Sequence, residues 1–487
     1  MVSLDSNRSA GFYVDGTWRV GSGGNFTTIN PVNGRESATF SIPDQIELEE
    51  IVKKSRASVD SRVWSQTKWH ERARVLDRVA AIMDTKIDEL AAAQSIGNGK
   101  TLKECRAQSQ AAADVFRYYA SVAETFETSV TTQRTQSLTL EINEPVGLVL
   151  AITPWNSPLT LEAQKLAPIL AGGNSVILKP SEITPHVSIV YAGIFAEAGI
   201  PENIVNVALG NGALGEQLVN SPAVDLITFT GGTAAGRAIA EAAGRRLCPV
   251  ILELGGKSPN IVLADADFEL AGKGCANGIF SGGGQSCIAG SRICVQSEIY
   301  DNFKEIFCDL AETFRFGLPD DQEADYGAMA TFKHRDSVHS MVQSAISEGG
   351  SVEVGGYVPD ITPYGDGAFY PATVISDLQA NATLCQDEAF GPVCVLQKFE
   401  TDDQLLELAN GTQYGLAAGI WTRSAKRAWH VASAIRAGTV WINTYKELSI
   451  STPFGGFKSS GMWREKGRQG ISIYLEKKGI YWNFENS

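Results

Sequence analysis

Three polar residues, in three separate stretches of the chain, have the chemistry to act on a carbonyl group. Cys287 lies in the glycine-rich stretch SGGGQSCIAGSR (281–292), and a cysteine thiolate is a strong nucleophile. Asn156, in ITPWNSP, could donate its side-chain amide to an oxyanion, or it could only stabilise a turn. Glu253, in LELGGKSP, is a candidate general base, because burial among apolar neighbours raises the pKa of a carboxyl group.

Three further stretches carry glycines or polar pairs that suit a nucleotide. GNGALG (210–215) is a literal G-x-G-x-x-G, but no acidic residue ends the following strand-like run, so a structural turn is the alternative. FTGGTAAG (229–236) offers glycines at a helix start, where backbone N–H groups can face a phosphate. ILKPSE (177–182) contains Lys179 and Glu182, a pair that suits ribose hydroxyls or is only a solvated ion pair. Each of these signals is weak alone.

The polar stretches follow short runs that are typical of parallel β-strands. From residue 146 onwards, five runs rich in β-branched residues alternate with helix-length segments: VGLVLAIT, SVILKP, IVNVALG, LITFTGG and VILEL. This alternation predicts an α/β domain with a doubly wound parallel sheet. Ligands bind beyond the carboxyl ends of such strands, so the sheet is expected to gather the polar stretches into one crevice.

The rest of the chain divides into a helical segment and a second α/β series. Residues 43–128 carry apolar residues at three- and four-residue steps, which predicts helices. In the first 40 residues, Asp15–Gly16 and Asn33–Gly34 predict tight turns between short strands. After residue 257, five strand-like runs predict a second sheet: RICVQ (292–296), PATVIS (371–376), GPVCVLQKF (391–399), GLAAGIW (415–421) and GTVWIN (438–443). The alternating run SIYLEKKGIYW (472–482) ends the chain and could be an edge strand that pairs with another subunit.

Composition and charge argue against several classes of protein. A chain of 487 residues predicts two or three domains, and a net charge of −14 argues against nucleic-acid or anionic membrane partners. The eight cysteines are scattered without a CxxC pair, and the first residues lack a signal-peptide pattern, so we expect a cytoplasmic location. The five histidines show no metal-ligand spacing, so no metal site is expected.

Seven motifs, in this order along the chain, resemble those of the NAD(P)-dependent aldehyde dehydrogenase superfamily: ITPWNSP, ILKPSE, FTGG, LELGGKSPNIV, GQSCIAGSR, DEAFGPV and PFGGFKSSG. The resemblance covers essentially the whole chain. It implies an α/β protein with a Rossmann-like cofactor domain, a second α/β catalytic domain and a small β oligomerisation domain. The implied boundaries are 1–126 and 146–256 for the NAD-binding domain, 257–460 for the catalytic domain, and 127–145 with 461–487 for the oligomerisation domain.

The resemblance also implies a reaction. Cys287 would attack a small-molecule aldehyde, and Asn156 with the Cys287 backbone N–H would hold the oxyanion of the resulting thiohemiacetal. Loss of a hydride to the nicotinamide would give a thioester, and Glu253 would activate the water that hydrolyses the thioester to the acid. Lys165 completes the expected catalytic set. The terminal strand would be covered by another subunit in a homodimer or homotetramer.

The implied cofactor residues lie mainly at strand ends. The family binds the pyrophosphate at the turn that corresponds to FTGG, which leaves GNGALG near the adenine. The carboxylate of Glu182 would repel a 2′-phosphate, so NAD is expected rather than NADP. The expected cofactor-binding residues are Ile152, Thr153, Pro154, Trp155, Lys179, Ser181, Glu182, Gly212, Phe229, Gly231, Gly232, Thr233, Gly236, Leu254, Gly255, Glu388 and Phe390.

The expected substrate funnel departs from the aromatic lining common in family members that act on simple aldehydes. We infer a wider and more polar funnel, suited to a semialdehyde-like, hydroxylated or aromatic catabolic intermediate. Two other departures are Gly232, which replaces a usual serine, and Trp463, which replaces a small residue. The expected substrate-pocket residues are Ser157, Leu161, Glu162, Gln164, Ser281, Ser286, Ile288, Lys446, Leu448 and Phe454.

Two alternatives to a hydrolytic enzyme remain open from the sequence. A CoA-acylating semialdehyde dehydrogenase would pass the acyl group to CoA, but such family members generally lack the base that Glu253 would supply. A catalytically silent structural relative would keep the fold without the reaction, which the presence of Cys287, Glu253 and Asn156 together disfavours.

Overall fold

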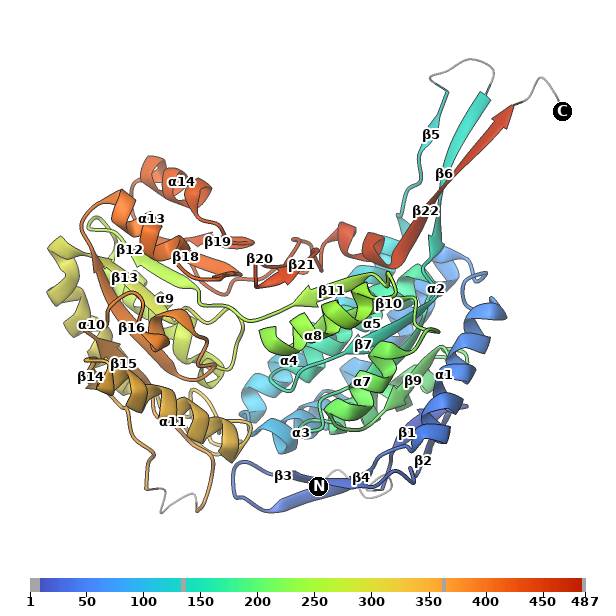
Figure 1. Cartoon of the computed structure of the whole chain (residues 1–487), viewed down its shortest axis with the longest axis horizontal. Coiled ribbons are helices and arrows are strands. Elements are labelled where there is room, and N and C mark those ends of the chain that lie inside the picture. The colour runs from blue at the N-terminus through green and yellow to red at the C-terminus, as the bar shows by residue number, and fades with distance from the viewer. Residues whose placement is uncertain (1–8, 133–136, 361–364, 484–487) are drawn as a thin grey trace.

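The computed structural model describes residues 9–132, 137–360 and 365–483. It has two α/β lobes, one around an eight-stranded sheet and one around a seven-stranded sheet, and a narrow three-stranded sheet that projects away from them (Figure 1). The chain passes from the first large sheet to the second between β11 (Val250–Glu253) and β12 (Pro259–Val262). The predicted α/β fold class and its two series of strands are therefore confirmed.

Five parallel strands form the centre of the first sheet, in the order β9-β8-β7-β10-β11. They coincide with the five predicted runs: β7 (Leu148–Ile152), β8 (Ser175–Lys179), β9 (Val205–Ala208), β10 (Leu226–Thr230) and β11. Every residue in them is buried, because helices cover both faces of the sheet. The antiparallel strands β1 (Phe12–Val14) and β2 (Thr17–Arg19) extend the sheet at one edge, and β21 (Gly461–Met462) extends it at the other.

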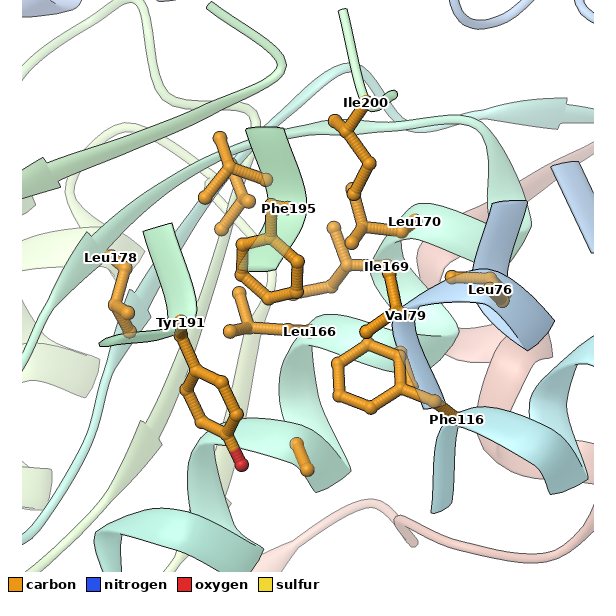
Figure 2. Packing of buried hydrophobic residues seen from close by; sticks show 14 of the residues in the cluster. Leu76, Val79, Phe116, Leu166, Ile169, Leu170, Leu178, Tyr191, Phe195 and Ile200 are labelled. Atoms are coloured by element: carbon orange, nitrogen blue, oxygen red, sulfur yellow. The ribbon is translucent and has the colours of Figure 1, made fainter. Parts of the chain in front are cut away.

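Alternate residues of these strands face two separate apolar cores. Val149 and Ala151 of β7 belong to one core, and Leu148 and Leu150 belong to the other. Helices α2 (Trp69–Thr85), α3 (Ile87–Asn98), α4 (Leu102–Glu124), α5 (Pro158–Gly172) and α6 (His186–Glu197) pack in the first core, part of which Figure 2 shows. Helices α1 (Gln45–Asp60), α7 (Gly212–Asn220) and α8 (Thr233–Gly244) pack in the second core.

The helices predicted over residues 43–128 are α1 to α4, and their ends follow from local capping. Asp44 and Glu47 form a capping box at the start of α1. Gly99 ends α3 with a left-handed φ of 74°, and the Thr101 side chain then caps α4. Within the described part of the chain, no helix is both long and apolar enough to cross a membrane.

The second sheet has the order β14-β15-β16-β13-β12-β18-β19 and is parallel except for β14 at its edge. The sequence pattern predicted five of these strands and missed β12 and β14 (Ser351–Val354), each of which has four residues. The five are β13 (Arg292–Gln296), β15 (Thr373–Ser376), β16 (Val393–Phe399), β18 (Ala417–Trp421) and β19 (Thr439–Ile442). Helices α9 (Phe268–Phe280), α10 (Tyr300–Thr313), α11 (Phe332–Ser347), α13 (Asp402–Asn410) and α14 (Ala425–Ala434) cover the sheet.

Short elements complete the fold. The predicted turns Asp15–Gly16 and Asn33–Gly34 join β1 to β2 and β3 to β4, and both glycines have a positive φ near 70°. The remaining short elements are β3 (Asn25–Ile29), β4 (Glu36–Ser41), α12 (Thr383–Gln386), β17 (Tyr414–Gly415), β20 (Phe457–Lys458) and the 3₁₀ turns Ser281–Gly284, Ser297–Ile299 and Arg468–Tyr474.

The projecting sheet has the order β22-β6-β5, with β22 (Leu475–Asn483) at its edge. β22 pairs antiparallel with β6 (Ser137–Pro145) along its whole length, and β6 pairs with β5 (Val130–Thr131). The terminal run of the sequence is therefore an edge strand, as its alternation predicted. It carries exposed aromatic side chains, among them Tyr481, which is 80% exposed.

The C-terminal part of the oligomerisation domain was expected to begin at residue 461. The packing of the residues that follow differs from this expectation. β21 (Gly461–Met462) is hydrogen-bonded to β11 in the first sheet, and Ile471 and Tyr474 are buried in the first core. Residues 461–474 therefore pack with the first lobe, and the projecting strand begins only at Leu475. The sequence pattern missed this difference because β21 has only two residues and pairs with a strand far away in the chain.

Candidate active site

The segment before Cys287 requires its glycines for backbone reasons. Gly282, Gly283 and Gly284 have φ values of 68°, 64° and 67°, which an L-residue adopts at a cost. A Cβ on Gly284 would lie 2.0 Å from the carbonyl oxygen of Gly391. The chain turns tightly after α9 and places Cys287 against the first sheet's carboxyl edge, so these glycines fix the nucleophile's position.

Three of the four predicted catalytic side chains meet in one cavity. This catalytic cavity has a volume of about 240 Å³. Asn156 reaches it from the loop after β7, Glu253 from the end of β11, and Cys287 from the loop after α9. It is lined by Pro154, Trp155, Asn156, Leu161, Gln164, Thr230, Gly231, Gly232, Glu253, Leu254, Gly255, Cys287, His334, Glu388, Phe390, Phe454 and Glu465.

Backbone contacts hold the Asn156 side chain and its loop. Asn156 is buried, and its Nδ2 donates to the carbonyl oxygen of Gln285 at 3.0 Å. Asn98, at the end of α3, donates to the carbonyl oxygens of Trp155 at 3.1 Å and Asn156 at 3.3 Å. No local pattern of residues points to Asn98, because its role depends on a contact between distant segments. The left-handed Gly99 that follows it marks the tight turn that brings it there.

Glu253 lies in an apolar and acidic environment. It is 5% exposed, and neither of its carboxylate oxygens has a hydrogen-bond partner among the described residues. Burial first, and then the neighbouring Glu465, raise the pKa of Glu253 well above its usual value, while Lys165, Arg464 and Lys466 oppose that rise. A buried carboxyl group with free oxygens can accept a proton from water, which is what a general base does.

Lys165 does not line the catalytic cavity itself. It is fully buried on α5, where its Nζ contacts Glu465 Oε1 at 2.6 Å and Thr228 Oγ1 at 2.8 Å. Glu465 does line the cavity, and no motif in the sequence pointed to it. The predicted Lys165 therefore contacts the cavity wall through Glu465, and its charge also acts on Glu253.

The thiol of Cys287 is protonated in this arrangement. Burial, then Glu388 and Glu253, raise the pKa of Cys287 to about 12, and Lys466 opposes the rise. The Lys466 ammonium lies 4.8 Å from the ring centroid of Phe454, which lines the same cavity. Because the thiolate is the nucleophile, the site needs a base or a bound positive charge to generate it.

A second cavity adjoins the first and contains most of the predicted cofactor residues. This cofactor cavity has a volume of about 590 Å³ and shares Pro154, Trp155, Thr230, Gly231 and Gly232 with the catalytic cavity. Gly215 also borders it, so the GNGALG stretch lies on the wall of the cavity. The predicted residues that line it are Ile152, Thr153, Pro154, Trp155, Lys179, Ser181, Glu182, Gly212, Phe229, Gly231 and Gly232.

The donors and acceptors of the cofactor cavity suit a dinucleotide. Lys179 Nζ lies 3.6 Å from Glu182 Oε2, so both side chains are placed to meet neighbouring hydroxyls. The buried hydroxyl of Thr230, which lines this cavity, has no partner within the part of the chain that is described. No atom lies within 4 Å of a Cβ on Gly232, which leaves the start of α8 open to a phosphate.

The remaining predicted cofactor residues lie beside the catalytic cavity or beneath it. Leu254, Gly255, Glu388 and Phe390 line the catalytic cavity. The backbone N–H of Gly256 donates to Glu388 Oε1 at 3.0 Å, and burial raises the pKa of Glu388 to about 7. Neither Thr233 nor Gly236 lines one of these two cavities. A Cβ on Gly236 would lie 2.4 Å from Leu254, so Gly236 serves close packing of α8.

Seven of the ten predicted substrate residues line either the catalytic cavity or a third, more polar cavity. Leu161, Gln164 and Phe454 line the catalytic cavity. Ile288 is buried next to Cys287, in a cluster with Leu416 and Trp441. A third cavity of about 420 Å³, here called the polar cavity, is lined by Lys100, Thr101, Lys103, Glu104, Gln108, Ser157, Asn277, Ser281, Gly282, Gln285, Ser286, Phe314, Ala324, Asp325 and Lys446.

Two predicted substrate residues are placed elsewhere. Glu162 is fully buried and accepts hydrogen bonds from Ser188 Oγ at 2.9 and 3.0 Å, so it faces α6. Its helical neighbours Leu161 and Gln164 share the opposite, cavity-facing side because they are one turn apart. Leu448 is 47% exposed and lines none of the three cavities. Neither Glu162 nor Leu448 therefore lines one of these three cavities.

Comparison with known proteins agrees with this arrangement. A model of the aldehyde dehydrogenase family matches residues 18–480. The chain belongs to this family. The betaine aldehyde dehydrogenase of Bacillus subtilis (strain 168) is 37% identical over 474 residues, 97% of each chain. The 2-hydroxymuconic semialdehyde dehydrogenase of Pseudomonas sp. (strain CF600) is 36% identical over 94% of this chain and 96% of its own.

Solved structures give the same family. A crystal structure of betaine aldehyde dehydrogenase from Staphylococcus aureus in complex with NAD⁺ matches with a TM-score of 0.95 at 36% identity, covering 98% of this chain and 95% of that chain. The aldehyde dehydrogenase KauB from Pseudomonas aeruginosa also matches with a TM-score of 0.95, at 34% identity and with 98% and 97% coverage. The family that the seven motifs predicted is therefore confirmed.

The glycine turn before Cys287 yields a testable expectation. Gly284→Ala forces an alanine into a left-handed conformation, which costs about 1–2 kcal/mol of stability. It also makes the new Cβ overlap with the Gly391 carbonyl. We expect a lower urea midpoint and slower alkylation of Cys287 by iodoacetamide. Gly16→Ala is the control. Gly16 has a φ of 71°, but the atom nearest to an added Cβ lies 3.4 Å away, so this substitution has the backbone cost without an overlap. Equal effects of the two substitutions would contradict the role given to the crowded turn.

Proposed function

We propose that this aldehyde dehydrogenase oxidises a polar aldehyde to the carboxylic acid with NAD, through a thioester on Cys287 that Glu253-activated water hydrolyses. One observation carries the proposal. Cys287, Asn156 and Glu253 line one cavity, and that cavity adjoins a second one with the polar groups of a dinucleotide site.

In the first step the sulfur of Cys287 bonds to the aldehyde carbon, and the carbonyl oxygen becomes an oxyanion. The Glu253 carboxylate lines the same cavity and is the base that can take the thiol proton. The second Nδ2 hydrogen of Asn156 and the backbone N–H of Cys287 stabilise the oxyanion. Loss of one such donor costs about 3–4 kcal/mol in a comparable site.

NAD, when bound, supplies the acceptor for the hydride that the thiohemiacetal loses as it becomes a thioester. Glu388 and Phe390 lie on the cavity wall where they can hold and cover the nicotinamide end, and Lys179 and Glu182 can bind the adenosine ribose. After Glu253 has released the thiol proton to solvent, it accepts a proton from water, and the hydroxide adds to the thioester carbon and expels the Cys287 sulfur as a thiolate. Lys165 pairs with Glu465, and its positive charge also favours the ionised form of Glu253.

The polar cavity, which borders the nucleophile segment, supports the proposal that the substrate is polar. Hydroxyl, amide and ammonium groups supply most of its lining, and aromatic side chains contribute little. The relatives named above act on betaine aldehyde and 2-hydroxymuconic semialdehyde, both of which carry a further polar group. A homodimer or homotetramer is proposed from the exposed edge of β22, whose unpaired backbone groups and aromatic side chains suit a second subunit.

Replacing the nucleophile should separate chemistry from binding. Cys287→Ala is expected to abolish NADH formation with every aldehyde, because no other group can form the thiohemiacetal, while NAD binding measured by calorimetry stays within about twofold. Cys308→Ala alters another accessible cysteine, on α10, and should keep full activity. Residual aldehyde oxidation by Cys287→Ala would overturn the covalent mechanism. It would still exclude the alternative that the protein is a catalytically silent structural relative.

Replacing the base should expose the acyl-enzyme. Glu253→Gln is expected to lower kcat by about 100-fold or more and to accumulate a thioester that intact-protein mass spectrometry detects. Because burial raises the pKa of Glu253, its basic form increases with pH. The wild-type kcat should therefore rise with pH, and that of the variant should not. Acceleration by added CoA would favour the acylating alternative instead.

The cofactor preference depends on Glu182. Two like charges about 4 Å apart repel by about 4 kcal/mol at an effective dielectric constant of 20, and solvent reduces this value because Glu182 is half-exposed. We expect kcat/KM to favour NAD over NADP by about tenfold or more, and Glu182→Gln to reduce that ratio. Glu216→Gln removes another carboxylate from the same cavity and serves as the control. Equal values of kcat/KM for NAD and NADP in the wild-type enzyme would contradict this preference.

A further inference from the structure

The polar cavity approaches the nucleophile from a side that the cofactor does not use. Ser286, the residue before Cys287, and Ser157, the residue after Asn156, both line it. It has no lining residue in common with the cofactor cavity. A substrate whose aldehyde lies at Cys287 can therefore place its remaining groups in the polar cavity.

Three lysines and two acidic residues give this cavity its charge: Lys100, Lys103, Lys446, Glu104 and Asp325. Both acids are already engaged within the protein. Glu104 is ion-paired with Lys100, and Asp325 accepts a hydrogen bond from the backbone N–H of Arg315 at 2.9 Å. Lys103 is exposed at the rim. The three lysines exceed the two acids by one positive charge, and Lys446 has no ion pair within the described part of the chain, although Glu104 acts on its charge from a longer distance.

The Lys446 ammonium has only weak partners. Its Nζ donates to the carbonyl oxygens of Asn277 and Ser281, at 3.4 Å in each case, which is long for a charged donor. Among the described residues, no carboxylate lies within ion-pair distance of it. Burial lowers the pKa of Lys446 to about 8, so it remains mostly charged near neutral pH. An ammonium in such surroundings gains strongly from an anionic partner.

The loop that carries Lys446 is fixed to the nucleophile segment. Tyr445 Oη donates to the carbonyl oxygen of Ile288, next to Cys287, at 3.0 Å. The Asn443 side chain accepts from Thr422 N at 3.0 Å and donates to Thr422 O at 2.9 Å. Lys446 itself adopts a left-handed φ of 61°, which is uncommon for a lysine and persists only where the surroundings enforce it.

We infer that Lys446 binds the carboxylate of the substrate, so that the natural substrate class is an aldehyde with a carboxylate at its far end. This inference rests on the proposed function, because it needs the aldehyde to lie at Cys287. The hydroxyl groups of Ser157, Ser281 and Ser286 add donors to the same wall. The same ammonium disfavours a quaternary ammonium group, so an aldehyde of the betaine type is a poor substrate here even though relatives of that name are 37% identical.

The test compares pairs of aldehydes that differ in charge and little in shape. Unbranched aldehydes with a terminal carboxylate are compared with their methyl esters, and betaine aldehyde is added as the cationic member. Wild-type kcat/KM is expected to be about tenfold or more higher for the carboxylate than for the ester, and lowest for the cation. Lys446→Met should remove the preference through KM for the carboxylate, while the ester keeps its kcat/KM within about twofold.

Controls distinguish local binding by Lys446 from a general electrostatic effect of the protein's charge and from misfolding. Lys446→Arg should retain the preference. Lys273→Met removes an exposed lysine one turn before Asn277 on α9 and should change nothing. NAD binding and the urea midpoint report whether Lys446→Met is folded.

Two results would overturn the inference. One is oxidation of carboxylate and ester at equal kcat/KM by the wild type. The other is an equal loss on both substrates in a folded Lys446→Met variant, since it would show a structural role. Cys287-dependent oxidation of the esters would leave the proposed function intact in both cases. Absence of NADH formation with every aldehyde would overturn the proposed function, and this inference with it.

Discussion

The register of three parallel strands is the constraint on which the active site depends. Ile152 of β7, Phe229 of β10 and Leu252 of β11 lie in one row across the sheet, and Thr230 pairs with Glu253 in the next row. The chain leaves all three strands at the same edge, so the residues that follow them come together in space. A slip by one residue would turn every side chain to the opposite face. Glu253 would then leave the catalytic cavity.

The second lobe contributes the nucleophile segment to the site at this edge of the first sheet. Its nucleophile segment reaches the first sheet through a turn of three left-handed glycines, and Asn156 closes the contact by donating to Gln285. Gly255 is equally constrained, because a Cβ there would lie 2.2 Å from Glu388. The site therefore lies where the two lobes meet, and the close approach of Glu388 to Gly255 and the hydrogen bond from Asn156 to Gln285 fix its geometry.

Desolvation governs the chemistry inside the site. Burial and the neighbouring Glu465 raise the pKa of Glu253, and the positive charge of the buried Lys165 partly offsets that rise. Cys287 keeps its proton for the same reason, since two carboxyl groups and burial oppose its ionisation. The site thus holds a nucleophile and a base that are both protonated more than usual, and small changes in surrounding charge shift both.

The sequence by itself determined the fold class, the five strands of the first sheet and the shared strand edge at which Asn156 and Glu253 lie; Cys287 was placed with them only by the resemblance to the family. These predictions succeeded because strand periodicity is local and because parallel strands share one carboxyl edge. Only the tertiary structure decided how the helix after β7 is rotated, which places Leu161 and Gln164 in the cavity and Glu162 in the core. It also decided the roles of Asn98 and Glu465 and the packing of residues 461–474 on the first lobe. Those features arise from contacts between segments far apart in the chain, which no local pattern of residues records.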